Sequence, residues 1–325
     1  MEIPNRGIVF FGTPDFAVAQ LEAIVHAGYS VTAVVTAPDK PAGRGKKIST
    51  SAVKDFALAH HLPLLQPLSL KDSQFLDELR SLQADLFVVV AFRMLPAEVW
   101  QMPELGTFNL HASLLPQYRG AAPINWAIME GETVTGLTSF FINDKIDTGE
   151  IILNDTLSIG ENETAGELHD RMALLGKKIT LETISQIFSG SCKPYRQDVG
   201  NLSQPLKSAP KIFRTDCLIQ WQAPIQQIHN QIRGLSPHPG AYTTIQDDHG
   251  RTIELKILRT SLARGNAPEN TGTLLSDGID PLYIALPDGT LRVHQLQQAG
   301  KKAMAADEFV RGFQPDGKWK LSAFA

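Results

Sequence analysis

The sequence predicts an α/β protein in which a mostly parallel sheet, covered on both faces, is followed by a small β-barrel. Through the first 190 residues, short apolar strand patterns alternate with amphipathic helical patterns, which is typical of parallel sheets. Beyond residue 208, short alternating runs are separated by turn residues, which indicates a β-barrel. The chain has 325 residues, more than one hydrophobic core usually holds, so we expect two domains.

The first strand is expected at residues 7–13, where the run GIVFFGT is apolar. Thr13 and Pro14 are typical of a helix cap and a first helical position, and Gly28 predicts the end of that helix. Later patterns predict strands at 31–36, 85–92, 107–116, 137–143 and 149–159, and helices at 50–61 and 70–82.

A long helix is expected to complete the first domain. Thr164 and Glu167 have the spacing of a capping box, and Gly190 predicts the helix end. Scattered Gly, Ser and Pro residues without periodicity follow, and a further helical pattern lies at 225–235. We therefore predict an N-terminal catalytic domain at 1–190, a linker at 191–208 and a C-terminal domain at 209–325.

The composition indicates a soluble globular protein. Hydrophobic residues make up 43% and charged residues 20% of the chain, and no apolar run reaches the roughly 18 residues of a membrane helix. The N-terminus lacks the basic start and cleavage site of a signal peptide. Cys192 and Cys217 have no CxxC spacing, so we expect free thiols in a cytoplasmic protein.

The charge is unevenly distributed along the chain. Residues 1–189 hold 14 Lys and Arg against 22 Asp and Glu, which gives −8, and residues 190–325 hold 16 against 12, which gives +4. A basic second half favours a polyanionic partner, and an ordinary solvated surface explains it equally well.

The most informative stretch is FNLHASLLPQYRGAAP, from Phe108 to Pro123. Asn109 and His111 are two residues apart in a predicted strand, so their side chains lie on the same face. An amide that donates to a developing oxyanion, beside a protonated imidazole, suits acyl chemistry. An isolated N-x-H would more often contain a core-edge histidine. Here the strand runs into a loop at its carboxyl end, where ligands of open α/β sheets bind, and this favours a functional site.

Asp147 follows in the turn IDTGEII and is the predicted partner of the histidine. A carboxylate beside an imidazole orients the ring and stabilises its charged form, and it can take a proton from an attacking amine. Asp-Thr-Gly is also ordinary turn chemistry, which by itself favours a structural role. Ser113, Leu114, Leu115 and Pro116 come directly after the histidine; they suit an apolar slot for a flat ring, or a plain strand-to-loop transition.

A basic loop lies at 38–47, where Lys40, Arg44, Lys46 and Lys47 are set among two prolines and two glycines. It has no apolar periodicity, so we expect a mobile loop at the sheet edge that is suited to phosphates, or else a solvated surface loop. The spacing GxxxxGK[ST] of a P-loop is missing.

Two cofactor classes are disfavoured by the sequence. FFGTPDF stands where a dinucleotide fingerprint would be, but it has one glycine where GxGxxG has three, so a nicotinamide-dependent oxidoreductase is disfavoured. The histidines other than His111 have no metal-ligand spacing, so no metal is expected.

The string NLHASLLPQYRGAAPINWAI, with IDTGEII downstream, resembles the 10-formyltetrahydrofolate-dependent formyltransferases. PAGRGKK, IRGLSPHPGAY and LPDGTLRVHQLQQAGKKAMAADEFVRG are similar to the members of that family that formylate methionyl-tRNA. The resemblance covers essentially the whole chain.

This resemblance implies a Rossmann-like N-terminal domain and a C-terminal barrel of OB-like topology that binds tRNA. It implies 10-formyltetrahydrofolate as co-substrate, initiator methionyl-tRNA as acceptor, and no metal. It also implies catalytic roles for Asn109, His111 and Asp147, a folate site that includes Ser113 to Pro116, and contact of the loop around Arg44 with the tRNA acceptor end. No long exposed apolar face is evident in the sequence, so we expect a monomer.

Four alternatives remain open at the level of the sequence. Within the same chemistry, the acceptor can be a nucleotide-sugar amine, or water in a formyltetrahydrofolate hydrolase; the basic loop argues against both, because a small acceptor gains little from it. Formylation of glycinamide ribonucleotide is disfavoured because that enzyme type lacks the barrel. A non-catalytic RNA-binding protein would explain the basic half and leave Asn109, His111 and Asp147 without a purpose.

Overall fold

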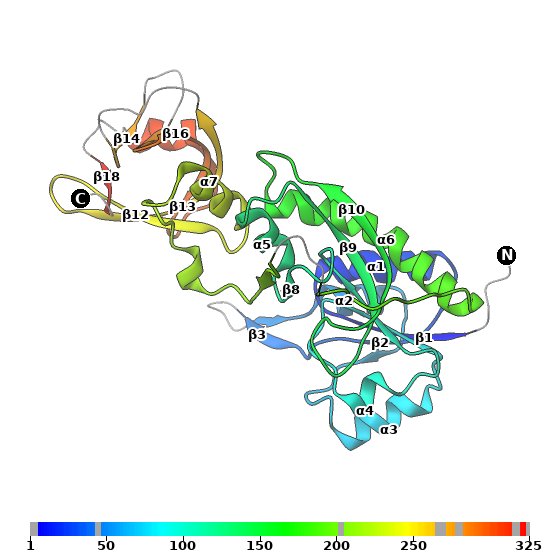
Figure 1. Cartoon of the computed structure of the whole chain (residues 1–325). Coiled ribbons are helices and arrows are strands. Elements are labelled where there is room, and N and C mark those ends of the chain that lie inside the picture. The colour runs from blue at the N-terminus through cyan, green and yellow to red at the C-terminus, as the bar shows by residue number, and fades with distance from the viewer. Residues whose placement is uncertain are drawn as a thin grey trace. The chain divides into compact units, whose positions relative to one another are not determined.

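The computed structural model describes residues 6–42, 47–200, 205–263, 271–276, 282–313 and 319–322. The chain forms two compact units (Figure 1). Unit 1 comprises Met1–Gly120, Thr135–Leu157 and His169–Ser208, and unit 2 comprises Ala121–Val134, Ser158–Leu168 and Ala209–Ala325. Two segments from the first 190 residues thus belong with the C-terminal unit. The domain boundaries expected from the sequence stay predictions.

A seven-stranded sheet forms the centre of unit 1, in the order β10-β9-β7-β6-β1-β2-β5. The neighbouring pairs from β5 through β2, β1 and β6 to β7 are parallel, whereas β9 runs antiparallel to β7. The prediction of a mostly parallel sheet is therefore confirmed. The strands are β1 (Gly7–Gly12), β2 (Ser30–Val35), β5 (Leu64–Leu65), β6 (Leu86–Val90), β7 (Thr107–His111), β9 (Val134–Phe141) and β10 (Ile151–Ser158).

Helices cover both faces of this sheet (Figure 1). Alternate side chains of β1 and β6, such as Val9 and Phe87, pack with Phe75 and Leu79 of α3 on one face. On the other face, α1 packs on α6, where the buried Gln20 side chain donates to the carbonyl of Ala173. The helices of this part are α1 (Asp15–His26), α2 (Ala52–Ala59), α3 (Ser73–Ser81), α4 (Ala97–Trp100) and α6 (Ala165–Ser189).

The capping box predicted before the long helix is present. The backbone N–H of Thr164 donates to Glu167 Oε2 at 2.9 Å, and the backbone N–H of Glu167 donates to the Thr164 hydroxyl at 3.3 Å. The first helix starts one residue later than expected, because Pro14 itself is the cap residue and Asp15 opens the helix. These two starts are set by local chemistry, which explains why the sequence locates them so closely.

Several expected strands are shorter in the structure, among them the strands expected at 107–116 and 149–159. The strand expected at 107–116 ends at His111, because the chain turns at Ser113, whose carbonyl accepts a hydrogen bond from Thr138 Oγ1 at 2.7 Å. The strand expected at 149–159 begins at Ile151, since Gly149 lies against the carbonyl of Phe141. Both ends are decided by neighbouring strands, which a local pattern does not report.

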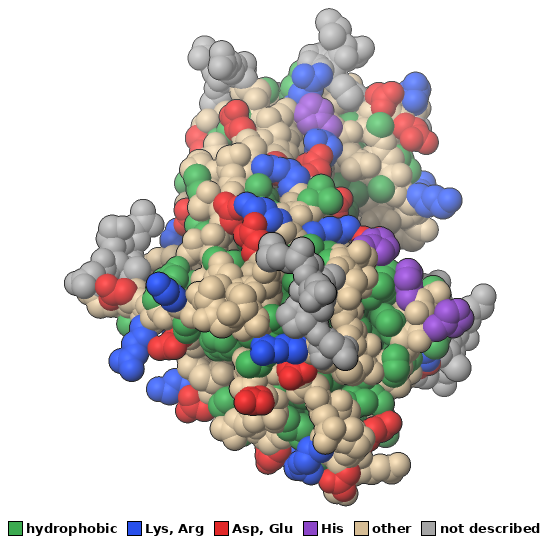
Figure 2. Space-filling view, turned by 90° about the vertical axis from the view of Figure 1, so that its right-hand side faces the viewer, with side chains coloured by type: hydrophobic (Ala, Val, Ile, Leu, Met, Phe, Trp, Pro, Cys, Tyr) green, Lys and Arg blue, Asp and Glu red, His purple; other side chains and the backbone are tan. Residues whose placement is uncertain are grey.

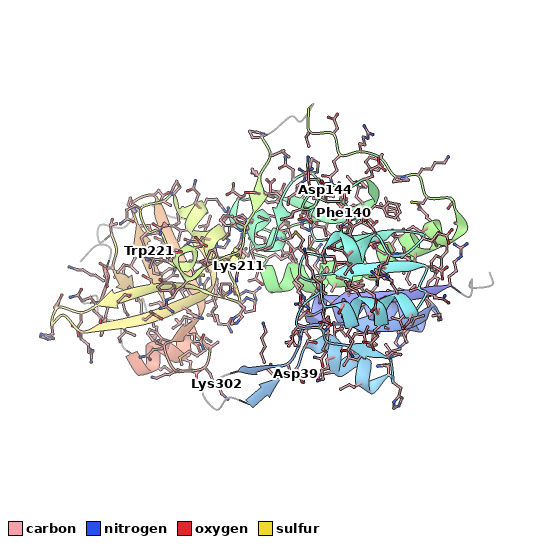
Figure 3. All side chains as sticks on the ribbon, turned by 90° about the horizontal axis from the view of Figure 1, so that it is seen from below. Asp39, Phe140, Asp144, Lys211, Trp221 and Lys302 are labelled. Atoms are coloured by element: carbon pink, nitrogen blue, oxygen red, sulfur yellow. The ribbon has the colours of Figure 1, made fainter. Side chains whose placement is uncertain are left out.

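Unit 2 contains the small barrel that the sequence predicts. Its sheet runs β14-β15-β16-β13-β12-β18, and a bridge between Thr273 and Lys320 joins the two ends and closes it. Trp221 lies inside, 2% exposed, with its indole N–H donating to Thr243 Oγ1 at 2.8 Å (Figure 3). The strands are β12 (Ala241–Gln246), β13 (Thr252–Ala263), β14 (Leu274–Leu275), β15 (Tyr283–Leu286), β16 (Gly289–Gln298), β17 (Met304–Ala305), which pairs with β16, and β18 (Lys320–Leu321).

Helices pack against this barrel within unit 2. Ile228 and Ile232 of α7 and Phe309 of α8 join the barrel core. The Asn125 amide of α5 donates to the carbonyl of Gly234 at the end of α7, at 2.7 Å. The helical elements are α5 (Pro123–Met129), α7 (Ile225–Gly234), α8 (Ala306–Phe313) and the 3₁₀ turn η1 (Arg214–Cys217).

Two short two-stranded pairs complete the fold. β3 (Lys40–Ala42) and β4 (Lys47–Ser49) form an antiparallel hairpin, and β8 (Arg119–Gly120) pairs with β11 (Ser208–Ala209). The helices in the described ranges are all too short or too polar to span a bilayer. On the face shown in Figure 2, Lys and Arg side chains are interspersed with Asp and Glu, which is the pattern of an ordinary solvated surface.

Candidate active site

The last strand residue of β7 is His111, and Asn109 precedes it on the same face of the sheet. The intervening Leu110 points to the other face and is 3% exposed. β1, β6 and β7 are parallel neighbours, so Gly12, Val90 and His111 mark one carboxyl edge. The structure therefore brings the predicted pair to the edge where ligands of such sheets bind.

The imidazole of His111 is buried, with 6% of the residue exposed. Its Nε2 lies 2.9 Å from the carbonyl oxygen of Tyr118. A carbonyl only accepts, so this contact places a proton on Nε2. The backbone thus fixes the ring through Nε2, and Nδ1 is the nitrogen that remains available for catalysis.

The Asp147 carboxylate faces that second nitrogen. Its Oδ2 lies 3.9 Å from His111 Nδ1, longer than a hydrogen bond but within the range of an ion pair when the ring is charged. The same oxygen accepts the backbone N–H of Gly120 at 2.9 Å. Asp147 has a φ of 53°, a left-handed conformation that aspartate tolerates better than most residues. The loop between β9 and β10 thus carries the carboxylate to the histidine.

Asn109 is half-buried and carries an unsatisfied group. Its side-chain oxygen is inaccessible to solvent and has no hydrogen-bond partner among the residues that the structure describes. Buried polar groups without partners are rare, because each costs free energy, and they concentrate where a ligand completes the bonding. This orphaned oxygen indicates that a hydrogen-bond donor of a substrate belongs beside His111.

Hydrogen bonds within the loop and from the neighbouring strand β9 hold the loop after His111. The Ser113 hydroxyl donates to the Gln117 carbonyl at 2.6 Å, and Thr138 Oγ1 both donates to the Ser113 carbonyl and accepts the Leu115 N–H at 3.1 Å. Ser113 is fully buried, and Leu115 packs on Phe140 (Figure 3) and Ile151. Of the predicted folate residues Ser113, Leu114, Leu115 and Pro116, only Leu114 and Pro116 keep partly exposed side chains.

Thr138 offers a direct test of this loop. Thr138→Val keeps the volume and removes both hydrogen bonds, which leaves the buried Ser113 carbonyl and Leu115 N–H without them. We expect a loss of about 1–3 kcal/mol in the free energy of unfolding and a raised KM for the co-substrate. Urea unfolding and steady-state kinetics measure the two effects. Thr133→Val, at a more exposed position outside this loop, is the control, and equal effects in both variants would contradict the assignment.

Arg119 lies beside these residues and is half-buried. Burial lowers the pKa of its guanidinium, and the negative charge of Asp147 partly offsets that shift. Its Nη2 donates to Gln197 Oε1 at 2.5 Å, while Nε is buried without a partner in the described ranges. Arg119 therefore adds a fixed positive charge to the site.

The predicted basic loop is only partly described. Lys40 is exposed in β3; Arg44 and Lys46 lie outside the described residues, and for Lys47 only the backbone, in β4, is described. The arms of this loop pair as a hairpin that the sequence did not predict, because pairing between these two segments has no apolar pattern to reveal it. Asp39 anchors its base through Lys54 at 2.6 Å and Gln66 at 2.9 Å, and these bonds lower the Asp39 pKa.

Sequence reasoning missed four contributors to the site, of which Arg119 is one. Tyr118 acts through its backbone carbonyl, so its side-chain identity carries no signal. Thr138 and Gln197 act from a neighbouring strand and from the predicted linker, and only the fold brings them near. Clusters of three or more potential metal ligands are absent from the part of the chain that the structure describes.

Two family models match the chain. Residues 6–184 match the family described as formyl transferase, and residues 211–314 match the family described as formyl transferase, C-terminal domain.

Curated relatives match over nearly their whole length. The chain is 47% identical over 323 residues to a methionyl-tRNA formyltransferase of Bacteroides fragilis, covering 99% of this chain and 100% of the relative. It is 50% identical over 315 residues to a protein of the same name from Azobacteroides pseudotrichonymphae, covering 96% and 97%.

Solved structures share the fold at low identity. HypX from Aquifex aeolicus, in complex with tetrahydrofolic acid, superposes with a TM-score of 0.63 at 16% identity, over 96% of this chain and 48% of HypX. An N-formyltransferase from Helicobacter canadensis, in complex with folinic acid and dTDP-3-aminofucose, superposes with a TM-score of 0.60 at 20% identity, over 91% and 99%.

Proposed function

The chain belongs to the formyl transferase family, and from that premise we propose that it transfers the formyl group of 10-formyltetrahydrofolate to the amino group of initiator methionyl-tRNA. One observation carries the chemistry: Asn109 and His111 lie on one face at the carboxyl edge of the sheet, with Asp147 3.9 Å from the histidine. Relatives 47–50% identical over nearly the whole chain bear the name of this activity.

Asn109 and His111 provide the donors for the reaction. When the amine attacks the formyl carbon, the carbonyl oxygen gains negative charge. The Asn109 amide and the Nδ1–H of a protonated His111 stabilise that charge, because both are held in place before the reaction begins. The bond from Nε2 to the Tyr118 carbonyl fixes the plane of the ring for this task.

Asp147 compensates the positive charge of the ring and handles a proton. The attacking amine becomes positively charged as its nitrogen bonds to carbon and then loses a proton, and the folate nitrogen gains one as the C–N bond breaks. Asp147 is the carboxylate beside His111, so it accepts the first proton, directly or through water, and passes it towards the leaving nitrogen. No covalent intermediate on the enzyme is required.

The loop Ser113–Pro116 suits the folate ring. Ser113 and Leu115 are buried and give the loop its shape, while Leu114 and Pro116 keep partly exposed apolar surface beside His111. The Asn109 oxygen, which has no partner among the described residues, belongs to a residue four positions before this loop. A flat, partly polar substrate is the kind of group that such a site binds.

The tRNA contacts are proposed for Lys40, Arg44, Lys46 and Lys47, in the basic loop at 38–47. Four basic residues in eight positions suit phosphate groups of a nucleic acid. The free thiols Cys192 and Cys217 agree with the cytoplasm as the compartment. The proposal takes the active form to be a monomer.

Arg44→Ala is expected to weaken the use of methionyl-tRNA and leave the KM for folate unchanged. Loss of one phosphate contact lowers the slope of log KM against log salt by about 0.7–0.9. Kinetics with methionyl-tRNA at several salt concentrations measure this slope. Lys71→Ala, an exposed cation before α3, serves as the control, and an Arg44→Ala enzyme with wild-type tRNA kinetics at every salt concentration would remove the assignment.

The function is tested by transfer of a labelled formyl group. Methionyl-initiator tRNA, uncharged tRNA and a UDP-amino-sugar are offered in parallel. Label on the charged tRNA alone is the expected result. Label on the sugar, or release of free formate, would keep the formyl chemistry and overturn the tRNA acceptor.

A further inference from the structure

We propose that Gln197 is a positioning residue for catalysis: it holds the Asp147 turn and Arg119 so that the Asp147 carboxylate stays opposite His111. The inference rests on the proposed function, because it assigns Asp147 a part in the reaction. It gives a task to the segment 191–208, for which the sequence predicted only a linker.

Both polar atoms of the Gln197 side chain form hydrogen bonds. Its Nε2 donates to the carbonyl oxygens of Asp147 at 3.0 Å and Gly149 at 2.9 Å, and its Oε1 accepts from Arg119 Nη2 at 2.5 Å. One amide thus joins the turn that carries the carboxylate to the cation beside it. Only an uncharged amide has both two donors and an acceptor for this set.

The Asp147 turn needs such support. With a φ of 53°, Asp147 adopts a left-handed conformation, which is strained for a residue that carries a Cβ. Such conformations persist where the surrounding structure holds them. The Gly120 N–H holds the carboxylate, and Gln197 holds the backbone on either side of Thr148. Without Gln197, one of these two supports is lost.

The position of Gln197 is itself fixed by the fold. Two residues earlier, Tyr195 pairs with Ile151 through backbone bonds of 2.8 and 2.9 Å, and the Tyr195 hydroxyl accepts from the Asn154 amide at 2.9 Å. This pairing adds residue 195 to the start of β10. The backbone bridge at Tyr195, two residues before Gln197, therefore places the Gln197 side chain at the turn.

The same segment also holds the other support of the histidine. The backbone N–H of Tyr118 donates to the carbonyl of Lys207 at 2.7 Å, and the Gln117 side chain accepts the N–H of Lys207 at 2.8 Å. Tyr118 is the residue whose carbonyl bonds His111. Residues 191–208 thus contact both loops that fix the ring, one through Gln197 and the other through Lys207.

Two substitutions isolate the role of the amide. Gln197→Met keeps the length of the side chain and removes all three bonds. Gln197→Glu keeps the acceptor for Arg119 but places a negative charge against two carbonyl oxygens. Val199→Ala changes an exposed side chain nearby that carries none of these bonds, and it is the control.

The test is a double-mutant cycle on the full-length enzyme, with Gln197→Met and Gln197→Glu each combined with Asp147→Asn. Turnover is followed as the loss of the formyl group from 10-formyltetrahydrofolate, which registers transfer to any acceptor, water included. Each single Gln197 substitution is expected to lower kcat by about 10- to 100-fold, as for a misplacement of about 1 Å. The KM for folate is expected to change less than about threefold, and Val199→Ala to match the wild type.

The cycle separates positioning from simple stabilisation. If Gln197 acts through Asp147, its substitutions cost less than about threefold in kcat when Asp147 is already Asn, since coupled residues are not additive. Equal losses in both backgrounds, or kcat values at the wild-type level, overturn the inference. Wild-type turnover without label on methionyl-tRNA overturns the proposed acceptor and leaves the cycle valid.

Discussion

Replacing His111 by Gln is expected to lower kcat for formyl transfer by about 10²–10⁴-fold, the range of a general acid–base or oxyanion group. Glutamine can still donate a hydrogen bond to the Tyr118 carbonyl that His111 Nε2 contacts. It cannot carry the positive charge that faces Asp147 at 3.9 Å. The fold around the loop is therefore kept while the chemistry is lost.

The measurement pairs single-turnover formyl transfer with folate binding by titration. Folate affinity within about threefold of the wild type shows that the site is intact, because the partly exposed loop side chains that suit the ring are unchanged. Asn109→Ala is expected to lose about 10²–10³-fold in kcat by removing one donor. His26→Ala, an exposed histidine at the end of α1, is the control. A His111→Gln enzyme with near-wild-type kcat would contradict the assignment.

Gly149→Ala is expected to lower the free energy of unfolding by about 3 kcal/mol or more, through overpacking against backbone. An ideal Cβ at Gly149 would lie 1.6 Å from the Phe141 carbonyl oxygen, far inside contact distance. The backbone would have to move, and the bond from the Phe141 N–H to the Glu150 carbonyl, 2.9 Å long, would be strained. Gly149 lies two residues after Asp147, so formyl transfer should fall as well.

Urea unfolding and kcat measure the two effects of Gly149→Ala. Gly200→Ala is the matched control, because the atom nearest its added Cβ is Asp198 Oδ1 at 3.6 Å, an ordinary contact. We expect the free energy of unfolding of that control to lie within about 0.5–1 kcal/mol of the wild-type value. Equal stability of Gly149→Ala and wild type would show that β9 and β10 approach each other differently from this structure.

Several features of the fold and of the site were predictable from local chemistry. Asn109 and His111 share a face because side chains alternate along any strand, whatever surrounds it. The capping box of Thr164 and Glu167 was predicted for a similar reason, since its bonds join residues three apart. The alternation of strand and helix patterns predicted the mostly parallel sheet without any contact being known.

The pairings between distant residues had no such signal. Asp147 meets His111 across 36 positions, and Gln197 reaches Asp147 across 50. The loop that holds His111 does so through the carbonyl of Tyr118, and every residue has a carbonyl. The sequence suggested Asp147 as the partner and passed over Gln197, because a carboxylate near an imidazole has a known chemistry and a lone glutamine has none.

By itself, then, the sequence determined which groups stand on one strand, where helices begin and which class of fold results, because these depend on neighbours within a few residues. The tertiary structure alone decided that His111 Nε2 is tied to backbone, that Nδ1 faces Asp147, and that the predicted linker supports that pair. Two of these contacts end on a backbone carbonyl, which every residue has, and the third joins side chains 36 positions apart. The order of amino acids therefore does not reveal them.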